Sequence, residues 1–404
     1  MSSVITGAPS VAQAYDRYSV VIAASIIYTM ALLVPFTMPA LIGLVAEQWS
    51  MSGSQLGIWA SAYALSLGLT GISSFYWVRR LNWRIGVWGG MLMLGISMGL
   101  HVIATDFYQL LILMLFGGAG GGLASAITIA VLGEGSNPQR NFGVMIFATV
   151  VIPAIVIASI PLVTANGGYT NGILMVAALI TASCILIVVL PISGKLSSDK
   201  VVNAGMATTT ISGGKVSNFR MPFAVLSMFL FIMGFMGAWS FLERIGNQSG
   251  LEQGSMYNAI AVGQLIGGLG GFFAIFICRY IGLRGSFVLA NILAIITLAG
   301  LNILDITLIV YFVMIASFML WIMVNMSNIT SYIAKIDSRG RVVSMIPGLQ
   351  SFGSFVGSII AGFAFEQSGK TGVVTASIVA FLLCIICMLS AFRFSLKEEL
   401  DLQP

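Results

Sequence analysis

The sequence predicts an all-α integral membrane protein with twelve transmembrane helices in two pseudo-symmetric six-helix halves. Three observations support this: the composition, the length of the apolar segments, and a repeat at a spacing of 200 residues. Of the 404 residues, 58% are hydrophobic and 8% are charged, whereas roughly a quarter of the residues in a soluble domain are charged. With a mean hydropathy of +1.02, most of the surface must face lipid.

The apolar segments have the length and pattern of helices. About 20 apolar residues cross the hydrocarbon core as a helix, and lipid allows only helices or a closed barrel. Barrel strands alternate polar and apolar residues, which the continuous run at 173–190 does not. The predicted spans are residues 18–44, 53–76, 85–104, 109–133, 141–164, 172–193, 221–245, 254–278, 286–304, 306–333, 342–365 and 372–392.

The basic residues predict the orientation, because Lys and Arg concentrate in cytoplasmic loops. With the N-terminus inside, only Arg244 and Lys370 of the 18 basic residues lie on the outer side. Both termini are thus expected in the cytoplasm, and the compact loops favour a bacterial inner membrane. The first apolar run has no basic leader or cleavage site before it, so it is expected to remain as an anchor. The net charge of +5 reflects this topology and does not indicate a nucleic-acid partner.

A polar segment and an internal repeat divide the spans into six and six. Residues 194–220 are rich in Gly, Ser and Thr and are interpreted as a cytoplasmic linker. They separate an N-terminal six-helix bundle, 1–193, from a C-terminal bundle with a short cytoplasmic tail, 221–404. The R-x-x-x-x-R pattern after span two recurs 200 residues later after span eight, and residues 140–146 are similarly repeated at 340–346. Duplicated six-helix units with a site between them are typical of many secondary transporters.

Over essentially its whole length the chain resembles the major facilitator superfamily of secondary transporters. The resemblance rests on the 6+6 duplication, the inner linker, the basic loops and the glycine-rich stretch Gly117–Gly122 in span four. The acidic member of the family's loop signature is missing, and Glu134 at the end of span four is the candidate partner for the arginines. Arginines that only fix the topology are the alternative. The predicted inner-gate residues in the two loops are Arg79, Arg80, Arg84, Arg279 and Arg284.

The resemblance implies a central cavity lined by spans one, four, seven and ten, with a monomer as the working unit. On span ten, Trp321, Asn325 and Asn328 share one helix face. They are predicted to contact the solute, with interhelical hydrogen bonding as the alternative. Further candidates for solute contact, for which simple packing is the alternative, are Tyr28 on span one, Tyr63 on span two and Gln264 on span eight.

Span seven carries Glu243, the acidic residue that is the strongest candidate for a functional role. Trp239 and Glu243 share a face, and Arg244 follows about 100° around the helix. A partly dehydrated Glu243 could carry a coupling proton or contact the solute. Trp239 and Arg244 are also candidates for solute contact, and Arg244 could meet a monocarboxylate. Two alternatives stay open: a Glu243–Arg244 pair that locks the outer gate, and a pair that marks the helix end. His101, near the outer end of peripheral span three, is expected to have a surface role.

The expected function is secondary active transport of a small organic solute by alternating access, with the proton as a candidate coupling ion. No Lys or Arg lies mid-span in the predicted lining helices, which disfavours a highly charged anion. The solute is expected to be neutral, zwitterionic or monoanionic, and aromatic side chains suit an aromatic one. A proton-driven multidrug or metabolite efflux antiporter is the alternative, and a non-transporting receptor or scaffold is the second alternative. One histidine cannot build an active site at membrane depth, so no enzyme, catalytic residue, metal or cofactor is expected.

Overall fold

The computed structural model describes residues 17–192, 220–337 and 341–401, and every regular element in these ranges is a helix. The N-terminal half contains α2 (Tyr18–Ala31), α3 (Leu33–Phe36), α4 (Met38–Trp49), α5 (Gly53–Trp77), α6 (Trp83–Leu100), α7 (Phe107–Gly133), α8 (Pro138–Thr164), α9 (Gly168–Ala182) and the 3-10 helix η1 (Ser183–Val189). The C-terminal half contains α11 (Arg220–Ser240), α12 (Leu242–Gln248), α13 (Gln253–Gly267), α14 (Gly270–Ile303), α15 (Leu308–Ile336) and α16 (Arg341–Asp401).

Twelve passes result because some passes are broken and some helices fold back. In the described chain, eight helices are each long and apolar enough to cross a membrane. One pass each is formed by α2–α4, by α9–η1, by α11–α12, and by α13 together with the arm of α14 before Gly282. α14 and α16 reverse at Gly282 (φ 69°) and Gly369 (φ 57°). Only glycine adopts these positive φ values at little cost. Both reversals thus lie where the sequence predicts a loop between spans.

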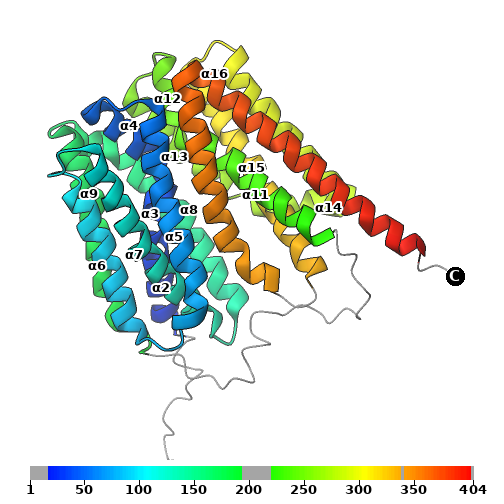
Figure 1. Ribbon diagram of the computed structural model, residues 1–404, viewed down its shortest axis with the longest axis horizontal. Helices are drawn as coiled ribbons and strands as arrows, with labels where there is room; N and C mark the ends of the chain where they lie inside the picture. Colours follow the sequence, from blue (N-terminus) through cyan, green and yellow to red (C-terminus); the bar gives the residue numbers. More distant parts are fainter. Residues whose placement is uncertain (1–16, 193–219, 338–340, 402–404) are drawn as a thin grey trace, which may run out of the picture.

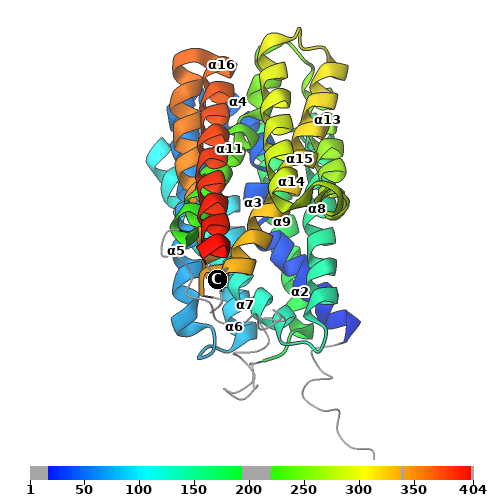
Figure 2. The ribbon, with the colours of Figure 1, turned by 90° about the vertical axis from the view of Figure 1, so that its right-hand side faces the viewer.

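The first pass is interrupted at its centre. Leu32 and Thr37 leave helical geometry on either side of the short α3. Pro35 and Pro39 account for these breaks, because proline has no N–H to bond the carbonyl four residues before it. In Figure 2 the dark blue helices change direction from α2 at the bottom to α4 at the top. The first pass is therefore kinked at its centre.

The surface of the bundle suits lipid. Large apolar side chains point outward along the long helices, among them Leu162, Ile185 and Ile309, each at least 74% exposed. Apolar patches on this scale indicate a partner of low polarity. A multi-pass membrane protein is the consequence.

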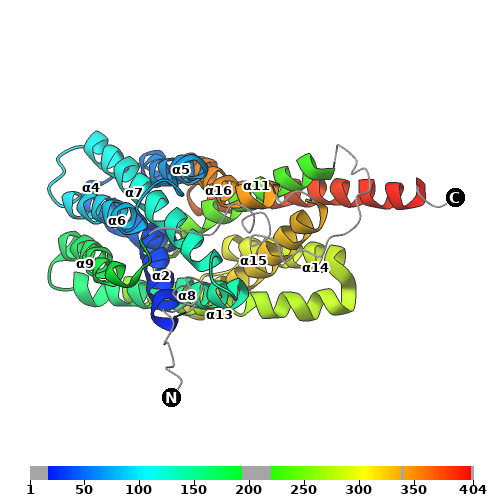
Figure 3. The same ribbon diagram turned by 90° about the horizontal axis from the view of Figure 1, so that it is seen from below.

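The two halves contact each other along most of α5 and α16, from Gly53 and Gly362 to Ile72 and Gly348. We call the end with Arg17, Leu190 and Arg220 the linker end, and the end with Trp49 and Gly53 the distal end. Across the halves, α5 contacts α16, α8 contacts α13, and α4 contacts α11 and α12. Figure 1 shows the halves meeting at the top and diverging toward the lower right, and Figure 3 shows them side by side from below. The predicted linker lies outside the described residues except Arg220, which begins α11.

Candidate functional site

Among the described residues, four side-chain hydrogen bonds join the halves, all between the break in the first pass and the distal end. They are Trp239 Nε1 to the Pro35 carbonyl (3.1 Å), Tyr257 Oη to the Ala40 carbonyl (3.3 Å), Gln253 Nε2 to Glu47 Oε1 (2.9 Å), and the Ser54 amide to Glu366 Oε2 (2.8 Å). These bonds close the distal end. Gly57 of α5 also lies against the backbone of α16 at Ser358 and Gly362.

The two prolines of the first pass place two of the predicted site residues. The Pro35 carbonyl cannot bond a proline at position 39, and it accepts from the Trp239 indole instead. The Ala31 carbonyl cannot bond Pro35, and it accepts from the Tyr63 hydroxyl at 2.8 Å. Tyr63 thus steadies the bent pass within its own half, whereas Trp239 ties the C-terminal half to it.

One stripe of the seventh pass faces the first pass. Trp239 meets Pro35, and Glu243, one turn further, meets Gly43. Phe235, one turn before Trp239 on the same stripe, is half-buried, and its ring lies 6.4 Å from the Trp239 ring and 6.2 Å from the Phe318 ring. An aromatic cluster therefore lies beside the break in the first pass.

Glu243 is fully buried at the closed distal end. Neither carboxyl oxygen has a hydrogen-bond partner among the described residues. A methyl group on Gly43 would stand 2.7 Å from both Glu243 Cδ and Tyr257 Oη, so only glycine leaves room there. The Tyr311 hydroxyl bonds the neighbouring Leu242 carbonyl at 2.8 Å. Glu243 is thus enclosed where α4, α12, α13 and α15 pack together.

Arg244 does not neutralise this carboxyl. Its guanidinium lies over the Phe365 ring, 5.9 Å from the centroid, and no ion pair joins it to Glu243 in the described chain. An ionised carboxylate without a partner is expensive in an apolar interior. The described chain therefore shows no Glu243–Arg244 ion pair, and the coupling role of Glu243 stays a prediction.

The polar stripe of span ten faces α14. Asn328 Nδ2 donates to Ser286 Oγ at 2.9 Å, and the amides of Asn325 and Asn291 lie 3.1 Å apart. Trp321 packs beside Ala274 and Ile277 of α14. These contacts favour the interhelical alternative, and solute contact by the three residues stays a prediction.

Gln264 is the buried polar side chain of span eight. It lies two turns from Tyr257 on the face of α13 that meets the first pass, is 9% exposed, and its Oε1 has no partner among the described residues. Tyr28 is half-buried on α2. Both stay candidates for solute contact.

At the linker end, the predicted gate residues differ in their surroundings. Arg84 Nε donates to the Leu190 carbonyl at 2.5 Å, which ties α6 to the sixth pass. The other four arginines of the predicted gate are exposed: Arg79, Arg80, Arg279 and Arg284. Glu134 is half-buried, and its pairing with this cluster stays a prediction.

The expected surface role of His101 is wrong. Its side chain is fully buried, with Nδ1 2.7 Å from the Ser97 carbonyl and the ring edge-on to Trp59 at 6.0 Å. Tyr169 covers it from α9 and bonds the His101 carbonyl at 3.2 Å. The expectation of a surface role rests on the position of His101 near a helix end, and that position does not show that Trp59 and Tyr169 enclose the ring.

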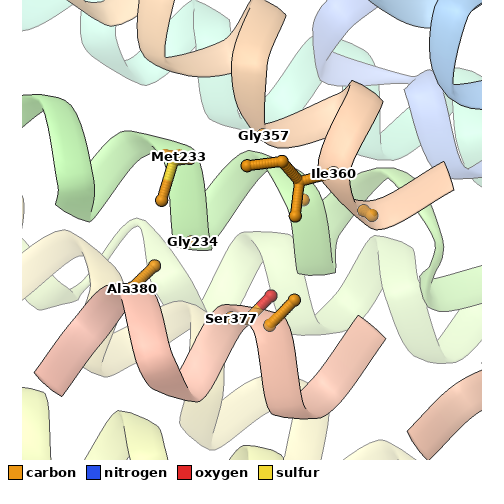
Figure 4. A pocket seen from close by; sticks show the side chains of 9 residues that line it. Met233, Gly234, Gly357, Ile360, Ser377 and Ala380 are labelled. Atoms are coloured by element: carbon orange, nitrogen blue, oxygen red, sulfur yellow. The ribbon is translucent and has the colours of Figure 1, made fainter. Parts of the chain in front are cut away.

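A separate small pocket lies between α11 and the two arms of α16 (Figure 4). Its labelled lining residues are Met233, Gly234, Gly357, Ile360, Ser377 and Ala380. It contains no charged side chain and belongs to the C-terminal half alone. It is therefore a packing feature of that half, away from the stripe that faces the first pass.

The amino-acid sequence matches a model of one known protein family over most of its length. The model of the Major Facilitator Superfamily matches residues 20–336. The chain belongs to the major facilitator superfamily. The predicted fold class is confirmed, and membership of this superfamily indicates a membrane transporter.

Solved structures share this superfamily fold at low identity. A bacterial homologue of the human lysosomal transporter Spinster, in an inward-facing unoccupied conformation, has a TM-score of 0.73 at 12% identity, covering 97% of this chain and 99% of its own. The occupied form gives 0.73 at 15% identity, with coverages of 95% and 98%. The nucleoside transporter NupG, in a mutant form, gives 0.68 at 13% identity, with coverages of 93% and 99%. No curated protein sequence matches the chain.

Proposed function

We propose that the protein is a proton-coupled secondary transporter of a small organic solute that is neutral, zwitterionic or monoanionic. It works as a monomer in a bacterial inner membrane, with the linker end in the cytoplasm and the distal end outside. The basic residues of the linker-end loops support this orientation. The halves rock about the midplane, so that the distal and linker ends open in turn.

The observation that carries the coupling proposal is the burial of Glu243 without a partner. At the closed distal end its carboxyl faces Gly43 and two tyrosines, and an ionised form would be expensive there. Closure therefore requires that Glu243 takes up a proton while the distal end is open. Loss of that proton afterwards favours reopening. The solute gradient and the proton gradient are linked through this one carboxyl group.

The experiment is transport by the purified protein in liposomes with an imposed pH gradient. A panel of small neutral, zwitterionic and monoanionic solutes is first tested for thermal stabilisation, and a stabilising solute is then used as the radiolabelled probe. Wild type is expected to accumulate the probe against its gradient. Glu243→Gln is expected to lose accumulation but keep exchange of labelled for unlabelled probe, because the amide mimics the protonated acid.

Glu252→Gln is the matched control. Glu252 is an exposed carboxyl at the same end that accepts from Ser255 Oγ at 3.0 Å, and its replacement should leave accumulation intact. Accumulation by Glu243→Gln at the wild-type level would disprove the coupling role. Accumulation only in liposomes with an acidic lumen would make the protein the efflux antiporter that the sequence offers as the alternative.

A further inference from the structure

Two carbonyls of the first pass, those of Ala31 and Pro35, lack a helical partner and accept a side-chain hydrogen bond instead. The bond from Trp239 to Pro35 differs from the bond from Tyr63 to Ala31 in joining opposite halves. Tyr63 and Ala31 belong to the same half, so their bond persists when the halves rock. Trp239 and Pro35 belong to opposite halves, so opening of the distal end separates them. A donor and an acceptor are then unpaired at the same time.

Neither group has a substitute partner nearby in its own half. The Pro35 carbonyl has no N–H four residues later, because position 39 is proline. Trp239 is 3% exposed, and the Phe235 ring lies 6.4 Å from its ring. Water can hydrate both groups in the open state, so a ligand that displaces it has to offer a matched acceptor and donor.

This pair lies near the middle of the membrane-spanning bundle, beside aromatic side chains. The break at Leu32–Thr37 lies midway along the first pass, which runs from Tyr18 to Trp49. Between the two breaks the chain stays helical as α3, so the pass bends without unwinding. Phe235, half-buried on the stripe that faces the first pass, offers a flat apolar surface one turn below.

We propose that Trp239 Nε1 and the Pro35 carbonyl form a two-point recognition site for the solute, which is a planar aromatic molecule carrying a primary amide or lactam. The solute carbonyl accepts from the indole and the solute N–H donates to Pro35, while its ring packs on Phe235. Solute binding replaces the bond that closes the gate, so departure of the solute lets the gate bond re-form. This inference rests on the proposed transport function and names its substrate class.

The test is a binding series on the purified protein, with three probes that differ in one group each. Benzamide has both the acceptor and the donor, N,N-dimethylbenzamide lacks the donor, and aniline lacks the carbonyl acceptor. Binding is measured by calorimetry. Wild type is expected to bind benzamide about fivefold more tightly than either comparison probe, since one hydrogen bond is worth about 1 kcal/mol.

Two variants remove one recognition point each. Trp239→Phe keeps a ring but loses the donor, so benzamide should lose its advantage over aniline and keep its advantage over N,N-dimethylbenzamide. Pro39→Ala supplies an N–H that can bond the Pro35 carbonyl, so benzamide should lose its advantage over N,N-dimethylbenzamide alone. A purely structural role would weaken all three probes together.

Trp59→Phe is the control, because the Trp59 indole N–H has no partner in the described chain and lies in the other half beside His101. It should leave all three affinities unchanged. Equal binding of the three probes by wild type, or no binding of any, would overturn the proposal. In that case the proposed proton-driven transport would still stand for another solute. That function is tested separately, by whether Glu243→Gln loses solute accumulation in liposomes.

Discussion

At the scale of single residues, one absent side chain decides how the distal end closes. Because Gly43 has no side chain, the Glu243 carboxyl and the Tyr257 hydroxyl can both pack against its Cα. The carboxyl and the glycine come from different halves. The sequence shows the acid but gives no sign of its glycine partner, because the two residues are 200 positions apart and no local pattern connects them.

Gly43→Ala is expected to hold the distal end open. The added methyl group would stand 2.8 Å from Glu243 Oε2 and 2.7 Å from Tyr257 Oη, both of which are too close. The measurement is the rate at which a maleimide labels Ala46→Cys, a buried position at the distal end, and it should rise several-fold in the Gly43→Ala background. Gly89→Ala is the control, because nothing lies within 4 Å of a methyl group there. An unchanged rate would mean that the interface adjusts without opening.

At the scale of helices, apolar length and proline position predict much of what is observed. The long apolar runs predict the passes, and Pro35 and Pro39 predict the broken first pass together with the two carbonyls it leaves free. Periodicity places Trp321, Asn325 and Asn328 on one face of α15, but it cannot say which helix that face meets. The observed neighbour is α14, which the chain brings there only through the packing of the whole half.

Asn328→Ala is expected to loosen the contact between α14 and α15 without changing solute binding. Asn328 links Ser286 and Cys278 Sγ (3.2 Å), and its loss leaves the buried Ser286 hydroxyl without that partner. An interhelical bond in membranes is worth about 1 kcal/mol, so the melting temperature should fall by a few degrees. Asn258→Ala, exposed on α13, is the matched control. A selective loss of probe affinity with unchanged melting would instead place Asn328 in the solute site.

At the scale of the whole molecule, the arrangement of the halves comes from contacts that sequence patterns do not encode. The repeat at 200 residues predicts two similar halves, yet it does not say along which helices they touch. The touching surfaces are glycine on glycine: a methyl group on Gly362 would meet the Gly53 carbonyl at 2.6 Å and Gly57 Cα at 2.8 Å. Small residues allow such close backbone approach between helices, and they also make the contact easy to separate, since no interlocked side chains must be withdrawn.

Gly57→Val should therefore wedge α5 away from α16 and move the whole protein toward the distal-open state. The bulkier side chain has no space, because the Ser358 carbonyl and Gly362 lie directly against Gly57. Spin labels on Gln48→Cys and Asn247→Cys, both exposed at the distal end of opposite halves, would report the distance between the halves. The distance distribution is expected to shift to longer values in Gly57→Val and to stay as in wild type in Gly71→Val, where the same helix has open space. If both variants keep the wild-type distribution, the α5–α16 contact follows closure rather than controlling it, and control would rest with Glu243 and Trp239 on the neighbouring pass.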